Sequence, residues 1–481
     1  MSQLERYFLR ILLVILAIGV RGSVELDCTP IADTDQVTGK TLYIPQNQQT
    51  PVTLPANFNC TYTVKPPIRV YAQITVTNLL KGVNDVITVI DGQNTKTLIT
   101  KTSSTSSIFY VFPQTVTTVT IDNQDPTSQC LVTIVYKSLP AATTNQLQKN
   151  QNLNYLTLTS VQLNPVTYAS DEPITLTLGR SGHITDDFSN YFVIDGSLDS
   201  TKSIRRLSDF QTSNFNSTGN SLSIVGLDAN TSFSTVMFTP TSASNGFSLL
   251  AGVSVNPNTG VITVRSSDNL KKGVMIVAPM REQLVLTGFL FTKTSDSCSA
   301  IASSGPPGFS QSKTLIDFVN DLFHLPQIFP FPYFSIITQN CDIQFQFGTV
   351  TPAGYYQTDK ETSGYIFSPS YLNSASKSDF NVTFEYTGDD KKQFVVDVID
   401  VEVNSNAELD IDIYDGDLKK TLSAVITGNQ MGTRSKAFGK YLNVHMSGNG
   451  NTKLRWQLTS SVGQIFGLQS ILLLVLVFSF F

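Results

Sequence analysis

Charged and catalytic residue types are scarce in this sequence. Only 14% of its residues are Asp, Glu, Lys or Arg, and no run of Lys or Arg is longer than two. A nucleic-acid partner is therefore not expected, because such a partner requires clustered basic residues. The three histidines, His183, His324 and His445, stand in no nucleophile elbow and in no His-Glu-x-x-His zinc motif. We therefore predict that the chain is not an enzyme.

The sequence gives no reason to exclude Asp and Glu as catalytic residues. Asp and Glu are scattered along the whole chain, and no particular pair stands out. Paired carboxylates are what glycoside hydrolysis requires. A hydrolase acting on glycans therefore stays open as an alternative function.

Hydrophobic residues make up 41% of the chain, and many alternate with polar ones. Within residues 70–76 every second residue is a small or β-branched apolar one, and within residues 409–414 apolar residues alternate with Asp410, Asp412 and Tyr414. This two-residue period predicts half-buried β-strands. A length of 481 residues predicts two to four domains. We expect an all-β secreted protein.

The first 22 residues have the features of a signal peptide. Arg6 and Arg10 precede a short apolar run, residues 11–20, and small residues before Ser23 suggest cleavage there. The alternative is a membrane anchor, but the run is short for a spanning helix. The mature protein is therefore expected outside the cytosol, where disulfides form.

The last residues, 460–481, resemble a signal for attachment of a GPI lipid. Small residues at 460–463 are followed by an uncharged spacer and an apolar tail, residues 471–481. We predict attachment at Ser461 or Ser460 and removal of the tail. The alternative is a transmembrane tail. A GPI lipid would hold the protein on the extracellular face of the plasma membrane.

Three strand-like segments end in Asp-Gly, a frequent turn dipeptide. They are residues 89–92, 193–196 and 409–416, and their recurrence favours a repeated module. The last segment is preceded by residues 364–371, which read Gly-Tyr-Ile-Phe-Ser-Pro-Ser-Tyr. Residues 24–138 have the order Cys28, Gly39, Pro45, Cys60-x-Tyr and then Asp-Gly.

These motifs, in this order, resemble the CUB domain and, for the first module, the divergent CUB-like family that is abundant in nematodes. The resemblance implies tandem antiparallel β-sandwich (jelly-roll) modules that bind other molecules and do no chemistry. It also implies a role in innate immune defence at the gut-cell surface, including lipid rafts. The ligand would be an extracellular protein or a glycan. A structural surface-coat protein is a further alternative.

The predicted division of the chain follows from these segments. It consists of a signal peptide (1–22), a first CUB-like domain (23–138), a linker (139–152), a possible second CUB-like domain (153–240), an intervening β-rich segment (241–345), a third CUB-like domain (346–459) and the GPI signal (460–481).

One helix is predicted in the intervening segment, at residues 314–324. Apolar residues recur there at helical spacing, Thr314 with Asp317 resembles a capping box, and Pro326 would end the helix. The aromatic, proline-rich residues 325–334 are expected to pack on a sandwich edge or between modules. An exposed aromatic partner site is the alternative.

Five cysteines leave one without a partner. We predict the bridges Cys28–Cys60, within the first CUB-like module, and Cys298–Cys341, whose cysteines bracket the intervening segment. Cys130 remains, as a buried small hydrophobe. It would otherwise pair between chains or displace one of the two bridges.

Two further kinds of site are considered. Asn-x-Ser/Thr motifs predict N-glycosylation at Asn59, Asn216, Asn230 and Asn381. We predict no cofactor and no metal. The resemblance implies calcium at Asp85 and Asp91 as an alternative to solvated carboxylates at a sheet edge.

Overall fold

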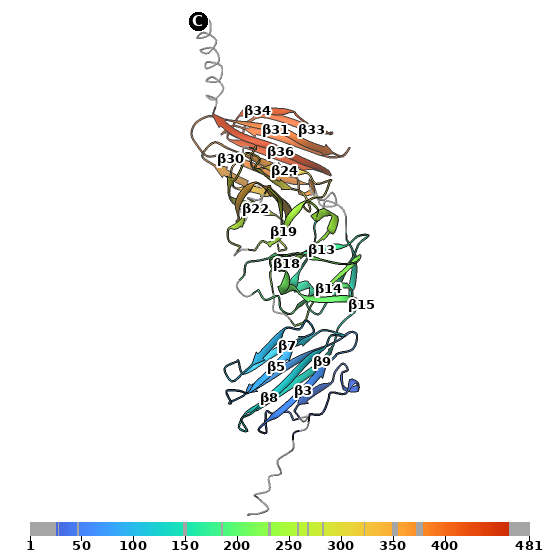
Figure 1. The fold of residues 1–481 in the computed structure, drawn as a ribbon. Helices are drawn as coiled ribbons and strands as arrows, with labels where there is room; N and C mark the ends of the chain where they lie inside the picture. Colours follow the sequence, from blue (N-terminus) through green and yellow to red (C-terminus); the bar gives the residue numbers. More distant parts are fainter. Residues whose placement is uncertain are drawn as a thin grey trace, which may run out of the picture. The chain divides into compact units, whose positions relative to one another are not determined.

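The computed structural model describes residues 26, 28–45, 48–147, 152–183, 186–228, 232–256, 259–266, 269–280, 283–321, 323–348, 355–371 and 379–460. Over these residues the fold is nearly all β (Figure 1). Its helical elements are 3-10 turns of three or four residues: η1 Asp33–Asp35, η2 Leu158–Val161, η3 Leu207–Phe210, η4 Thr241–Ser244 and η5 Pro369–Tyr371. The predicted all-β class is confirmed. The chain divides into two compact units, Met1–Ala141 and Ala142–Phe481.

The first unit is a sandwich of two antiparallel sheets. One sheet has the order β1-β9-β4-β7, with β2 also on β9, and the other has the order β3-β8-β5-β6. The strands are β1 Thr41–Ile44, β2 Val52–Thr53, β3 Phe58–Val64, β4 Val70–Leu79, β5 Val86–Ile90, β6 Lys96–Ile99, β7 Ser106–Val111, β8 Thr117–Asn123 and β9 Gln129–Ser138.

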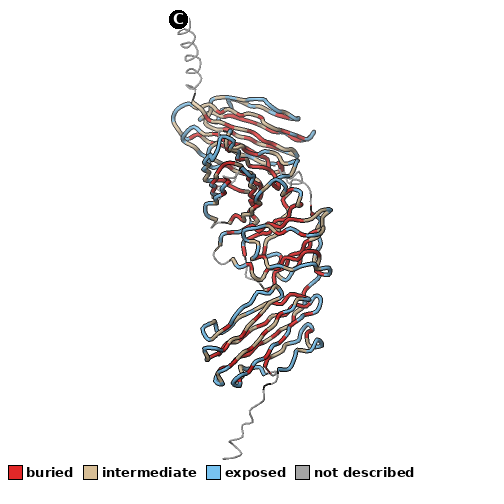
Figure 2. Tube along the Cα trace, viewed as in Figure 1, coloured by how far each residue is buried: buried red, intermediate tan, exposed pale blue. Residues whose placement is uncertain are grey.

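Strict alternation places the core of this unit between its two sheets. In β3 the residues Phe58, Cys60, Tyr62 and Val64 are buried and those between them are exposed. Figure 2 shows the same alternation of buried and exposed residues along the strands. Each large apolar side chain buried in this way stabilises the fold by about 1.5–3 kcal/mol.

The second unit begins with a sandwich built on the same plan. Its sheets are β10-β12-β17-β14-β15 and β11-β18-β13, with β16 also on β13. The strands are β10 Thr143–Gln146, β11 Asn154–Thr157, β12 Val166–Ala169, β13 Ile174–Arg180, β14 Tyr191–Ser197, β15 Ser200–Arg206, β16 Phe215–Asn216, β17 Ser221–Gly226 and β18 Thr235–Pro240.

The intervening sandwich follows, with a different strand order. One sheet is β19-β21-β26-β23-β24, joined to β13 through β19, and the other is β20-β27-β22-β25. The strands are β19 Phe247–Ser254, β20 Ile262–Val264, β21 Lys271–Val277, β22 Leu284–Lys293, β23 Ser299–Ser303, β24 Thr314–Asp317, β25 Gln327–Phe329, β26 Tyr333–Gln339 and β27 Cys341–Phe347.

The C-terminal sandwich returns to the first plan. Its sheets are β29-β36-β31-β34 and β28-β30-β35-β32-β33. The strands are β28 Tyr355–Thr358, β29 Thr362–Phe367, β30 Phe380–Tyr386, β31 Lys392–Val403, β32 Glu408–Tyr414, β33 Lys420–Ile426, β34 Arg434–Phe438, β35 Tyr441–Ser447 and β36 Gly450–Ser460.

Three of the four sandwiches therefore share one topology. With eight common strands numbered along the chain, β1 and β3–β9, β11–β18 and β29–β36 all have the sheet orders 1-8-3-6 and 2-7-4-5. The Asp-Gly dipeptides at 91 and 415 directly follow the fourth common strand, and Asp195-Gly196 lies near the end of that strand, β14, at a shift in its register with β15. The sequence repeat thus reflects a repeated fold.

The segment that leads into each of these three sandwiches is fixed to the second common strand. In the first sandwich the disulfide Cys28–Cys60 joins it to β3. In the other two a parallel strand does so, because β10 pairs with β12 and β28 pairs with β30. The disulfide of the first sandwich and the parallel strand pairs of the other two thus attach the leading segment to the same common strand.

The second and intervening sandwiches are joined where β13 and β19 pair in parallel. Gly179 lies opposite Gly252 in this short ladder. A Cβ at Gly252 would lie 2.8 Å from the Cα of Gly179 and 2.8 Å from the Leu178 carbonyl oxygen. The close backbone approach therefore requires glycine.

The apolar pattern of β31 agrees with its pairing, and the helix predicted from the sequence is wrong. Alternation changes phase within residues 397–403, and the register of β31 shifts between Val398 and Asp400, as at a β-bulge. The helix at 314–324 does not form. Instead β24 pairs with β23, which buries the neighbours Leu315 and Ile316 completely. The Asp317 carboxylate then accepts hydrogen bonds from the backbone N–H groups of Val319 and Asn320, which makes a turn.

We predict that replacing Cys28 and Cys60 together by serine lowers the stability of the first unit by about 2–4 kcal/mol, because the open chain regains conformational freedom. Hydrogen exchange of peptides from β3, β4 and β9 in the full chain would measure the loss.

The matched control replaces Cys298 and Cys341 by serine, which should speed exchange in the intervening sandwich and leave the first unit unchanged. Unchanged exchange of β3 in the first variant would show that the bridge does not stabilise that unit.

Candidate functional site

An aromatic cavity of about 260 Å³ lies within the second unit, between the intervening and C-terminal sandwiches. Strand β25 and the start of β22 supply one wall, and β28, β29, η5 and β30 supply the rest. The lining residues are Gln283, Ile328, Pro330, Tyr356, Tyr365, Ile366, Phe367, Pro369, Phe380, Asn381, Val382 and Phe384.

Ten of the twelve lining side chains are aromatic, aliphatic or proline. The two others, Gln283 and Asn381, are uncharged carboxamides. The aromatic wall is ordered by ring contacts: the ring centroids of Tyr356 and Phe384 lie 5.2 Å apart, and Phe384 packs on Trp456 at 4.1 Å. Such geometry is typical of stabilising aromatic pairs.

A buried glutamine holds the two walls together. The Gln327 side chain is 2% exposed and lies along the edge of β29. Its Oε1 accepts the Tyr365 backbone N–H at 2.9 Å, and its Nε2 donates to the Tyr365 carbonyl at 3.0 Å. One side chain therefore satisfies both backbone groups of a residue on an edge strand, where unpaired groups would be costly.

His324 continues this edge contact two residues further along β29. Its backbone N–H donates to the Ser363 carbonyl at 2.8 Å, and its ring Nδ1 accepts the Ser363 backbone N–H at 3.1 Å. The Ser363 hydroxyl also lies 3.2 Å from Nδ1. The histidine and the serine thus meet, which the sequence did not reveal. Because Nδ1 already accepts the Ser363 backbone N–H, we interpret the contact as structural: His324 pairs with the backbone groups of Ser363 at the edge of β29.

Charged residues surround the same junction outside the cavity. Lys453 on β36 is 9% exposed, and its Nζ donates to the Thr314 carbonyl at 3.0 Å. Burial lowers the pKa of Lys453, and the carboxylates of Asp321 and Asp400 oppose that shift. Asp400 also forms an ion pair with Lys313 at 3.2 Å.

The aromatic, proline-rich residues 325–334 contribute to this junction. Phe329, Phe331 and Phe334 are each no more than 2% exposed, and Phe329 stacks against Phe367 of β29. Packing between sandwiches, the preferred expectation, is therefore what the structure shows. These rings are not an exposed partner site.

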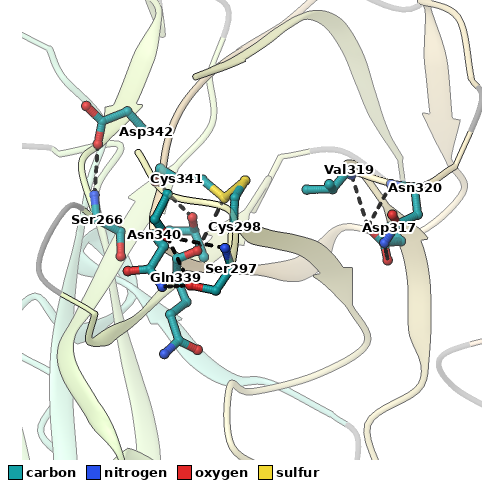
Figure 3. Close-up of a disulfide and its surroundings, with 12 residues drawn as sticks. Ser266, Ser297, Cys298, Asp317, Val319, Asn320, Gln339, Asn340, Cys341 and Asp342 are labelled. Atoms are coloured by element: carbon teal, nitrogen blue, oxygen red, sulfur yellow. Dashed lines mark hydrogen bonds between the residues drawn. A yellow bond between two sulfur atoms is a disulfide. The ribbon is translucent and has the colours of Figure 1, made fainter. Parts of the chain in front are cut away.

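The bridge Cys298–Cys341 lies elsewhere in the intervening sandwich (Figure 3). It joins the segment before β23 to the first residue of β27. Next to it the Asn340 side chain donates to the Ser297 hydroxyl at 2.7 Å. Both predicted disulfides are present, and neither contributes a residue to the cavity.

Cys130 is the remaining cysteine, and it is fully buried in β9. Burial raises the pKa of its thiol to about 12. A thiol of this kind is neither a nucleophile nor available to another chain. Cys130 therefore takes the place of a small hydrophobic residue in the core of the first unit.

Asp85 is a buried carboxylate held entirely by the protein, which corrects the expectation of a solvated edge carboxylate. It is 1% exposed, and its oxygens accept the backbone N–H groups of Gly82, Gln124 and Asp125 and the hydroxyl of Ser128. Burial alone would raise the pKa of Asp85, but these hydrogen bonds lower it below its ordinary value.

Asp91 lies at the opposite end of β5 from Asp85. Six residues of extended chain span roughly 20 Å, so the two carboxylates do not share one ion. Asp91 accepts the backbone N–H groups of Gln93 and Thr95 in its turn. Within the described ranges no cluster of three His, Cys, Asp or Glu residues is suited to hold a metal.

Three predicted glycosylation sites are exposed: Asn59 on β3, Asn216 on β16 and Asn381 on β30. Asn230, Ser461 and the signal peptide lie outside the described residues. Ser460 ends β36, where its backbone N–H donates to Glu361 at 2.9 Å. In the part of the chain that the structure describes, no helix is long and apolar enough to cross a membrane.

Neither of the other two histidines is among the described residues that line the cavity. His445 lies 3.7 Å from Asp410 on the outer face of the C-terminal sandwich, and His183 packs against the ring of Phe233. Asp410 also forms a hydrogen bond with Glu408, which raises the pKa of Glu408.

Comparison with known proteins identifies the first unit. The CUB-like domain family matches residues 23–140. The CUB1-EGF-CUB2 domains of rat MASP-1 are similar in structure with 10% sequence identity, over 44% of this chain and 99% of that one, at a TM-score of 0.18. The full extracellular region of zebrafish Gpr126/Adgrg6 matches with 9% identity, over 65% and 52%, at a TM-score of 0.17. No curated protein matches the sequence significantly. The chain therefore carries a CUB-like domain at its N-terminal end.

We predict that Gln327→Ala destabilises the second unit by about 2–3 kcal/mol, because it leaves the N–H and C=O of Tyr365 without a partner. Urea unfolding followed by the fluorescence of Trp456 would measure this. Gln344→Ala, at an exposed position of β27, is the matched control and should change little. Equal stability of the two variants would contradict the role of Gln327.

We also predict that Asp85→Asn destabilises the first unit at neutral pH. Since folding lowers the pKa of Asp85, its contribution is present above the unfolded pKa of about 3.9 and is lost as pH falls through the folded value. The difference between parent and variant, measured by hydrogen exchange of β5 and β9, should therefore shrink below about pH 4. Asp122→Asn, on the outer side of β8, is the control. A difference that persists at low pH would point to packing instead.

Proposed function

We propose that this protein is a non-enzymatic extracellular glycoprotein, held on the cell surface by a GPI lipid, that binds protein or glycan ligands in innate defence. The observation that carries the proposal is the CUB-like domain at residues 23–140. CUB domains are extracellular binding modules. Two further sandwiches have the same strand order, which supports a binding role for them as well.

Several features of the molecule support an extracellular binding role. Two disulfides join distant segments, as is usual in oxidising compartments. Exposed Asn-x-Ser/Thr sites occur in three sandwiches. The immune role and the association with rafts are supported only by the resemblance to the CUB-like family of nematodes.

The alternatives find less support in the same residues. A glycan hydrolase would need two carboxylates across a cleft, and the described residues that line the aromatic cavity include no carboxylate. A surface coat linked through Cys130 would require that buried thiol to leave the core. Binding without catalysis fits the described residues better.

We predict that phosphatidylinositol-specific phospholipase C releases the protein from animal cells that express the full chain, because the lipid would be its attachment. Immunoblotting of the medium would measure release.

A known GPI protein in the same culture is the positive control. A variant whose residues 464–481 are replaced by a spanning helix should stay on the cells. Retention of the parent while the positive control is released would exclude the lipid anchor and favour a transmembrane tail.

A further inference from the structure

We infer that the aromatic cavity between β25 and β28–β30 is a binding site for an uncharged, largely apolar small molecule of two or three rings or an equivalent short chain. The inference does not depend on the GPI anchor or on the CUB-like domain, because every wall residue belongs to the second unit.

The size of the cavity sets the size of the ligand. Its volume of about 260 Å³ exceeds what a single ring needs, since a cavity of about 150 Å³ holds benzene. It lies just below the range of about 300–1,000 Å³ that is usual for drug-sized ligands.

The lining sets the chemical class. Among the described residues no charged side chain lines the cavity, so a charged ligand would lose its hydration without a partner from these walls. Flat apolar groups would gain contacts with Tyr356, Phe367 and Phe380, and the carboxamides of Gln283 and Asn381 would offer a few orienting hydrogen bonds.

The cavity is built in advance of any ligand. Gln327 and His324 form hydrogen bonds with the backbone of β29, which fix the wall that contains β25. Phe329 of β25 also stacks on Phe367 of β29. Rigid walls reduce the ordering cost of binding.

Asn381 places a predicted glycan beside this site. It is the exposed member of the lining set, and its Oδ1 accepts a hydrogen bond from Asn443 at 2.7 Å. Asn443 also donates to Thr383 at 2.9 Å, the residue that completes the Asn-x-Thr motif. Binding must therefore be tested both with and without this glycan.

The chain offers a built-in reporter for the experiment. Trp456 is its single tryptophan, and it packs at 4.1 Å on Phe384, which lines the cavity. Energy transfer from Trp456 would therefore report a fluorophore bound near this site, and a variant that fills the cavity locates it there.

The probe is N-phenyl-1-naphthylamine, an uncharged fluorophore, added to the full-length protein purified from animal cells. Its matched control is 1-anilinonaphthalene-8-sulfonate, which has the same rings and one negative charge. We expect saturable energy transfer with the neutral probe and at least tenfold weaker binding of the sulfonate. Val382→Phe, which fills the cavity, should weaken binding at least tenfold, and Val425→Phe, on an exposed strand of the same sheet, should not.

Two further variants keep the result decisive. Thr383→Ala removes the glycan and Thr383→Ser keeps it, so a cavity covered by sugar is distinguished from one that binds nothing. Tyr356→Ala, which removes a partly exposed ring from the wall, replaces Val382→Phe if that variant does not fold. Absence of energy transfer in both the glycosylated and the Thr383→Ala proteins would overturn the inference, as would equal binding of the charged and neutral probes.

Discussion

The unpaired edges of the β-sheets are the constraint on which the rest of this structure depends. An edge strand presents N–H and C=O groups that must be bonded or covered. The chain meets this need with the parallel strands β10 and β28 and with the side chain of Gln327 at β29. Each solution fixes one segment against a sandwich that could otherwise pair with another chain.

Coverage of the β29 edge also creates the candidate site. Because Gln327 bonds to Tyr365 through its side chain, β25 lies beside β29 without joining its sheet. The intervening and C-terminal sandwiches meet here through side chains and leave a gap. Backbone pairing of β25 with β29 in one continuous sheet would close that gap. Most of the described lining residues belong to the hydrophobic cores or pack against them, which explains why the cavity is aromatic.

Local patterns predicted much of the fold, and long-range contacts account for what they missed. The Asp-Gly segments and the two-residue alternation of the strands are visible in a few consecutive residues. The prediction of a helix at 314–324 was wrong because Leu315 and Ile316 are both buried where β24 pairs with β23. The helical spacing of apolar residues gives no information about that partner strand. The bond between Gln327 and Tyr365 joins residues 38 positions apart, so no local pattern could predict the cavity.

A second similarity between sandwiches concerns buried carboxylates. In the first, Ser128 immediately precedes β9 and donates to Asp85. In the second, Ser234 immediately precedes β18, the corresponding strand, and donates to Asp186. Both carboxylates come before the fourth common strand, and a hydroxyl group before the eighth holds each one. The loop carboxylate therefore acts as a hydrogen-bonded tie between two connections at one end of the sandwich. At the other end two Asp-Gly turns make matching contacts, because Asp91 and Asp415 each accept the backbone N–H groups of the second and fourth residues after them.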